Sequence, residues 1–243
     1  MRKTTGGIPF TPRAALALLL SAAAACGGER GNGRGGAPAE GDTAGPPVSG
    51  GTAVMAELAD INHPTTLLAE SSLDGDIGGD VLFSSLSRSA WRDGRLVFMN
   101  ATESPAALAR GWEFLPPDST ALRYHLVSGY RWSDGQPLTA ADVVFTYALL
   151  KNPAVASPQQ DFAQNIDSVT AENDTTVTFW FNRRYPDMLY HSGMAIVPKH
   201  VFGQGDPGQI RNHPAWSDPA RNLVVSGAYR IGEWVKNDHF TLV

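Results

Sequence analysis

The chain has 243 residues, of which 42% are hydrophobic and 18% are charged, so it can build the core of one large or two small globular domains. Its formal net charge of −5 argues against a nucleic-acid partner, because such a partner requires a basic surface.

The first 25 residues have the pattern of a secretion signal. An apolar run at 14–25 follows three positively charged side chains, those of Arg2, Lys3 and Arg13. The run is too short to span a bilayer as a stable helix, and it ends in alanines directly before Cys26, the only cysteine. The string Ala-Ala-Ala-Cys resembles a bacterial lipobox. We therefore expect residues 1–25 to be a lipoprotein signal peptide and Cys26 to carry a lipid; an ordinary signal peptide with an incidental cysteine is the alternative.

Residues 26–53 are rich in Gly, Pro, Ala and Ser and have no hydrophobic period, so we expect a disordered tether, with folded sequence from residue 54. Removal of residues 1–25 would leave 16 basic and 24 acidic residues, a net charge of −8. No later stretch is apolar and long enough for a transmembrane helix. The sequence therefore predicts an acidic exported domain that is attached to the membrane by lipid alone.

Two polar segments follow in the expected folded part. Residues 70–76 are rich in turn formers, and Asp74 and Asp76 are spaced as at the start of a calcium loop. The downstream Glu that such a loop needs is missing, so we predict no metal there. The turn formers at 92–95 predict a hairpin ahead of an apolar segment.

The next stretch has the densest local signals in the chain. Apolar residues alternate with polar ones over 122–126, which predicts a half-buried strand. A second short strand is predicted at 130–132, before a turn. Thr139 then predicts a helix N-cap, and Asp142 completes a capping box. These signals describe a structural unit and indicate no chemistry by themselves.

After this helix, alternating patterns at 166–171 and 177–181 predict the two strands of a hairpin. A short helix is predicted at 186–190, and the last residues, 240–243, have the pattern of a strand.

The stretch Trp132–Phe145, WSDGQPLTAADVVF, closely resembles the signature of the family 5 extracytoplasmic solute-binding proteins, the peptide, dipeptide and nickel receptors of ABC importers. Residues 195–201 (AIVPKHV) and 224–234 (VVSGAYRIGEW) are similar to further segments of that family. The resemblance implies an α/β fold, with a periplasmic-binding-protein-like type II lobe and a smaller β-rich subdomain.

The resemblance also implies a division of the chain. Residues 54–88 and 173–243 would form the first lobe, and residues 89–172 would form the inserted subdomain. Family members extend well beyond this length, so we expect an N-terminal portion of a longer receptor, with the second lobe missing.

Residues 81–86 resemble the end of a helix in the family, and the loop before that helix reaches the ligand cleft, where its main chain pairs with an extended peptide. By position, the resemblance implies the following ligand-binding residues: Ser71, Ser72, Leu73, Gln159, Ser226 and Gly227. Gln159 occupies a place where some peptide-binding members have a tyrosine over the ligand, so a different ligand stays open. A plain solvent loop is the alternative for the first three residues.

The resemblance implies a non-catalytic function: capture of a solute, with peptides as the expected class, and delivery to ABC permease subunits. We expect an extracytoplasmic, lipid-anchored monomer of the cell envelope that holds no cofactor or metal. Nickel, haem and oligosaccharides stay open as ligands. A ligand-sensing or scaffold lipoprotein without transport is the main alternative. An exported hydrolase is disfavoured, because the sequence has no Gly-x-Ser-x-Gly or His-Glu-x-x-His motif.

Overall fold

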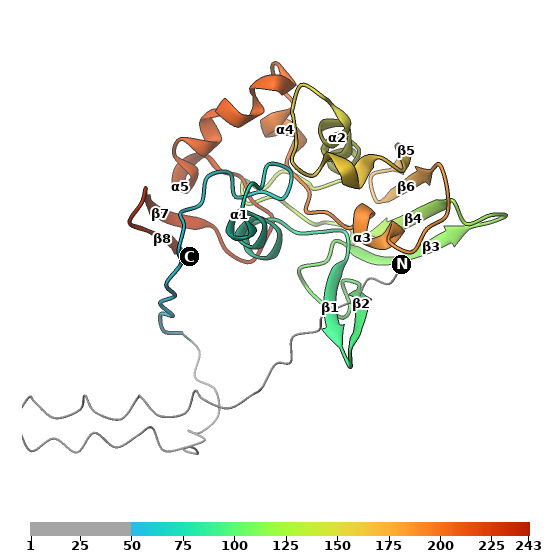
Figure 1. Ribbon diagram of the computed structural model, residues 1–243, viewed down its shortest axis with the longest axis horizontal. Coiled ribbons are helices and arrows are strands. Elements are labelled where there is room, and N and C mark those ends of the chain that lie inside the picture. Colours follow the sequence, from blue (N-terminus) through green and yellow to red (C-terminus); the bar gives the residue numbers. More distant parts are fainter. Residues whose placement is uncertain (1–49) are drawn as a thin grey trace, which may run out of the picture. The chain divides into compact units, whose positions relative to one another are not determined.

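The computed structural model describes residues 50–243, of which 55–243 form one compact unit (Figure 1). The expected signal peptide, the lipid site at Cys26 and most of the expected tether lie outside the described residues. No helix within the described part is long and apolar enough to cross a membrane.

The largest sheet is four-stranded and antiparallel, in the order β3-β4-β6-β5. Its strands are β3 (Ala109–Leu115), β4 (Ala121–Leu126), β5 (Ile166–Asn173) and β6 (Thr176–Phe181). Alternate side chains of a strand point to the same face, so Leu122, Tyr124 and Phe179 lie together on the inner face of the sheet. All three are fully buried. Helices α2 (Ala140–Lys151) and α3 (Met188–Ser192) cover this face (Figure 1).

Two further hairpins lie outside this sheet. β1 (Arg88–Arg92) pairs with β2 (Arg95–Met99), and β7 (Ile231–Val235) pairs with β8 (His239–Leu242). The turn between β1 and β2 has positive φ at Asp93 (51°) and Gly94 (71°), the backbone that a two-residue hairpin of matching twist requires. The expected hairpin turn is confirmed.

The other helices are short. They are α1 (Ser72–Asp76), the π-helical η1 (Ile77–Leu82), α4 (Lys199–Phe202) and α5 (Pro219–Asn222), with 3-10 turns η2 (Gln160–Ala163), η3 (Pro207–Asn212) and η4 (Pro214–Trp216).

The structure confirms the strand at 122–126, the capped helix after Thr139 and the hairpin of β5 and β6. The strand expected at 130–132 is wrong. Its polar groups pair within the same loop, since Trp132 N–H donates to the Gln136 carbonyl at 2.9 Å. Only an isolated bridge from Arg131 to Pro137 is formed.

The expected boundary between subdomain and first lobe, at 172/173, falls within β5, whose ladder with β6 continues across it. The division into lobe and subdomain therefore stays a prediction.

The carboxylate of Asp142 joins two helix starts that are far apart in the sequence. One oxygen accepts the Thr139 N–H at 2.9 Å, which completes the capping box of α2, and the other accepts the Lys199 N–H at 2.9 Å at the start of α4. The side chain is buried, and a buried carboxylate is tolerated where strong donors satisfy it. His200 extends the same junction, because its ring lies 2.7 Å from the Asp134 carboxylate.

We expect Asp142→Ala to lower the free energy of unfolding by about 1–3 kcal/mol, because the N–H groups of Thr139 and Lys199 lose the buried carboxylate that accepts them. Urea denaturation of the full chain measures this loss. The matched control is Asp161→Ala, which removes an exposed carboxylate in η2 and should change stability by under about 0.5 kcal/mol. Equal losses in the two variants would contradict the role given to Asp142.

Candidate functional site

One open pocket of about 550 Å³ lies where α1, η1, the base of the β1–β2 hairpin, η2 and α3 meet. These elements come from three separate parts of the sequence, and Figure 1 shows α1, α3 and β1 facing the same region. Ser85 joins two of the parts, since it forms β-bridges to both Ala107 and Ala195. The volume falls in the range of small-molecule sites.

The wall formed by α1 begins with a tightly held turn. The Ser71 hydroxyl caps α1 by accepting the Asp74 N–H at 3.1 Å, and it donates to the Asp74 carboxylate at 3.0 Å. Asp74 is fully buried and also accepts the Asn62 N–H at 2.7 Å. These bonds fix Ser71 and the following Ser72 at the pocket edge.

Charged side chains of the pocket are mostly acidic: three carboxylates and one guanidinium line it. Arg88 pairs with Asp80 at 2.5 Å and donates to the Gly79 carbonyl at 2.7 Å. Glu70 pairs with Arg211 at 2.6 Å. Among the described residues Asp76 has neither an ion pair nor a side-chain hydrogen bond, so the lining carries an uncompensated negative charge.

The facing wall is aromatic. Phe98 of β2, Phe162 of η2 and Tyr190 of α3 line it, and the rings of Phe162 and Tyr190 are 5.6 Å apart. His191 stacks behind Phe162 at 4.9 Å and lies within hydrogen-bond distance, 3.0 Å, of the Tyr185 hydroxyl. Burial lowers the pKa of His191 from its ordinary value of 6.5, an effect that Asp187 opposes in part. The uncharged imidazole therefore supports this wall.

The structure brings Ser71, Ser72 and Gln159 to the pocket, but it places the other expected ligand-binding residues elsewhere. Leu73 is half-buried against the core. Ser226 is buried, and its hydroxyl accepts the Ser84 N–H at 2.9 Å.

Gly227 belongs to the same internal junction as Ser226. Its N–H donates to the Leu82 carbonyl at 2.7 Å, and a Cβ at this position would lie 2.1 Å from the Val81 carbonyl oxygen. Close packing of two backbones thus explains the glycine.

Sequence reasoning missed the aromatic wall and the carboxylates at the pocket edge. The sequence indicated only that Phe98 ends an apolar segment after a hairpin turn. No local pattern indicated that Phe162 and Tyr190 would meet, because they are brought together by packing of η2 against α3.

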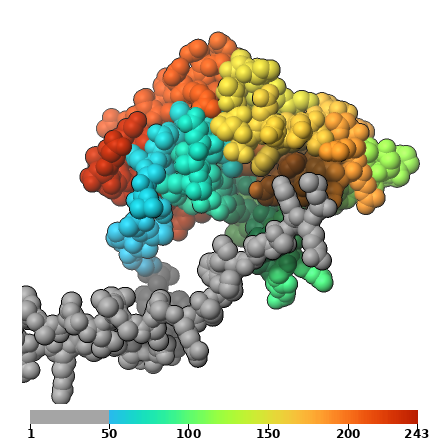
Figure 2. All heavy atoms as spheres, in the orientation of Figure 1, coloured from blue at the N-terminus to red at the C-terminus, as the bar shows by residue number. Residues whose placement is uncertain are grey.

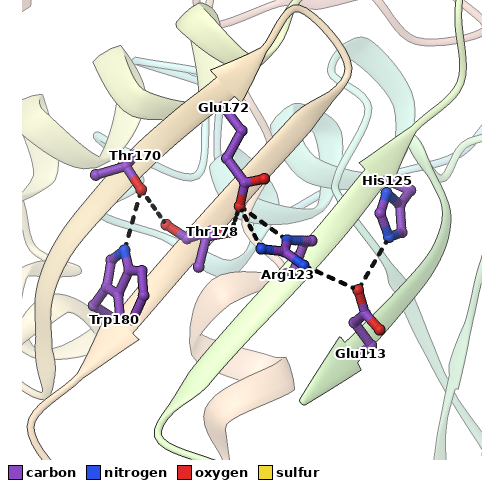
Figure 3. Close-up of polar contacts among 7 residues, drawn as sticks. All are labelled: Glu113, Arg123, His125, Thr170, Glu172, Thr178 and Trp180. Atoms are coloured by element: carbon purple, nitrogen blue, oxygen red, sulfur yellow. Dashed lines mark hydrogen bonds and ion pairs between the residues drawn. The ribbon is translucent and has the colours of Figure 1, made fainter. Parts of the chain in front are cut away.

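The outer face of the central sheet carries a second polar cluster (Figure 3). Arg123 lies between two carboxylates, Glu172 at 2.9 Å and Glu113 at 3.4 Å, and Thr178 donates to Glu172 at 2.7 Å. The hydrogen bond from Thr178, with that from Arg123, lowers the pKa of the Glu172 carboxyl. These polar groups satisfy one another across all four strands of the sheet, as cross-strand pairs that stabilise it.

Within residues 50–243, no group of three or more His, Cys, Asp or Glu side chains is arranged to hold a metal ion.

Comparison with known proteins gives a family match over more than half of the chain. The profile of the "Bacterial extracellular solute-binding proteins, family 5 Middle" matches residues 104–243.

Two curated relatives match 56% of the chain. The periplasmic oligopeptide-binding protein OppA of Salmonella typhimurium is 30% identical over 156 residues. The "Probable deoxycholate-binding periplasmic protein YgiS" of Escherichia coli is 32% identical over 156 residues. Each match covers 27% of the relative, so the chain spans only a part of their length.

The fold is similar to that of the oligopeptide-binding protein AppA from Bacillus subtilis, solved with a nonapeptide, at a TM-score of 0.61 and 22% identity. The similarity covers 73% of this chain and 33% of AppA.

We expect the stability of the chain to fall as the pH drops below about 6.5, in part through His191. Its pKa is lowered in the folded state, so between the two pKa values the unfolded chain binds more protons, and acidification favours unfolding. His191→Gln removes this contribution. Urea denaturation at pH 7.5 and 5.5 should show a smaller loss of stability on acidification in the variant than in the wild type; an identical loss would contradict the assignment.

Proposed function

Because the chain belongs to family 5 of the bacterial extracellular solute-binding proteins, a non-catalytic family, we propose that it captures peptides outside the cytoplasm and delivers them to the permease of an ABC importer. Two of the relatives that it matches are named as periplasmic binding proteins, one of them for oligopeptides. We further propose a monomer that is held at the membrane through a lipid on Cys26.

The observation that carries the proposal is the pocket itself. It combines an open entrance, a fixed turn at Ser71 and Ser72, and an aromatic wall within one volume of about 550 Å³. A peptide supplies both amide groups for polar contacts and side chains for the aromatic wall. Receptors of this kind close two lobes around the solute by hinge motion.

The charge of the pocket bears on the ligand class. The excess of carboxylates disfavours anionic solutes such as bile acids, and Asp76 offers a partner for an ammonium or guanidinium group. Gln159, near Phe162, offers an amide where a tyrosine would add apolar surface, which favours polar peptides over purely apolar ligands.

A ligand-sensing or scaffold role without transport is the second candidate, and it shares the binding step. The two differ only in whether a permease accepts the loaded protein. ATP-dependent uptake of a labelled peptide into vesicles that contain the permease would separate them.

We expect the full chain to bind short peptides, and Ser72→Trp to weaken that binding at least tenfold, because the indole would fill the pocket at an exposed position. Titration calorimetry with a pool of tetrapeptides measures the effect.

The matched control for this test is Ser128→Trp, which places the same side chain in an exposed turn of the chain away from the pocket lining and should bind as the wild type does. If Ser72→Trp binds peptides as the wild type does, the pocket is not the peptide-binding site. A wild-type chain that binds no peptide would contradict the proposed function.

A further inference from the structure

The β1–β2 hairpin shares one of its faces with the pocket. Ser89 pairs with Phe98, and both line the pocket. Trp91 pairs with Leu96 two residues farther toward the turn. Because alternate residues of a strand point to the same side, these four side chains form a single face that begins inside the pocket and continues beyond it.

The outer part of this face is apolar and open to solvent. The Trp91 side chain is 75% exposed and Leu96 is 39% exposed, whereas Phe98 is half-buried at the pocket. Among the described residues Trp91 takes part in no aromatic pair, and the single cation–π contact is that of Arg183 with Tyr185. In Figure 2 the hairpin, in green, protrudes from the surface. An apolar group that covers these two side chains would remove apolar surface from water, which favours binding.

We propose that Trp91 and Leu96 form a second subsite of the ligand site, which holds an apolar side chain of an extended peptide. The inference rests on the proposed function and adds one requirement on the ligand, an apolar side chain outside the pocket. We define the outer subsite as Trp91 and Leu96.

The spacing of the hairpin sets the position of that side chain in the ligand. Two residues along a strand advance about 6.6–6.8 Å. A peptide in extended conformation advances by the same amount, so the side chain on the outer subsite belongs to the residue two positions from the one at Ser89 and Phe98. The ligand must therefore be long enough to reach beyond the pocket.

A peptide is the favoured occupant of the outer subsite, because this subsite continues directly from the pocket. The outer subsite is joined to the pocket through Phe98 on the same face, whereas Arg92 and Arg95 lie together on the opposite face. Within the described residues, β1 pairs with β2 alone, so its other edge is free to accept the main chain of an added strand.

The test uses the full chain and alanine pentapeptides. Penta-alanine is compared by titration calorimetry with five variants that carry one Phe, at each position in turn. We expect Phe at one position to raise the affinity roughly fivefold or more over penta-alanine, as partial burial of an aromatic ring allows. Trp91→Ala should reduce that gain to under about twofold, and Trp91→Phe should restore most of the gain.

Trp180→Ala is the matched control, because Trp180 is 44% exposed on the outer face of the central sheet and should not affect the preference. A Phe preference that survives in Trp91→Ala overturns the outer subsite and leaves peptide binding intact. A wild-type chain that binds none of the six peptides overturns both proposals. Sedimentation that shows a dimer lost in Trp91→Ala would assign the face to a second copy and overturn the inference.

Discussion

The buried carboxylate of Asp142 is the constraint on which the rest of the structure depends. It accepts one N–H at the start of α2 and another at the start of α4, so it fixes two segments that are 57 positions apart. α2 packs on the inner face of the central sheet, where Tyr147 meets Phe179 at 4.8 Å. The chain just ahead of α4 includes Met194 and Ala195, which line the pocket. A single charge-assisted junction thus sets the pocket wall relative to the sheet.

A second junction, behind the pocket, is held by hydrogen bonds of hydroxyl groups and not by a charged side chain. Ser84 donates its N–H to the Ser226 hydroxyl at 2.9 Å, and the Ser84 and Tyr130 hydroxyls each donate to the Ser226 carbonyl at 3.0 Å. The Ser84 and Tyr130 hydroxyls themselves lie 2.8 Å apart. Gly227, which follows Ser226, lets two backbones touch. Of these groups, Ser226 and Gly227 were expected to bind ligand; the structure places both in this junction and outside the pocket lining, and their role in ligand binding stays a prediction. The walls they support combine carboxylates on one side with aromatic rings on the other, which suits a peptide with a cationic group.

The sequence was informative where structure is local. The capping box, the turn at Asp93 and Gly94, and the alternation in β4, β5 and β6 follow from neighbouring residues, and all were predicted. The strand predicted at 130–132 was wrong because its alternating aromatic residues belong to a loop whose backbone groups form hydrogen bonds within the loop. The aromatic wall could not be predicted, because Phe98, Phe162 and Tyr190 meet only through tertiary packing. Membership in the family was predictable from one signature, whereas the set of residues that line the pocket was not.

Peptide capture at this pocket can be tested by hydrogen–deuterium exchange of the full chain, with and without a saturating pool of tetrapeptides. We expect slower exchange of backbone N–H groups at residues 69–89 and 159–163, which border the pocket, and unchanged exchange in the signature loop at 133–137, which is exposed and outside it. Unchanged exchange throughout the chain, or protection confined to the signature loop, would contradict peptide capture at this site.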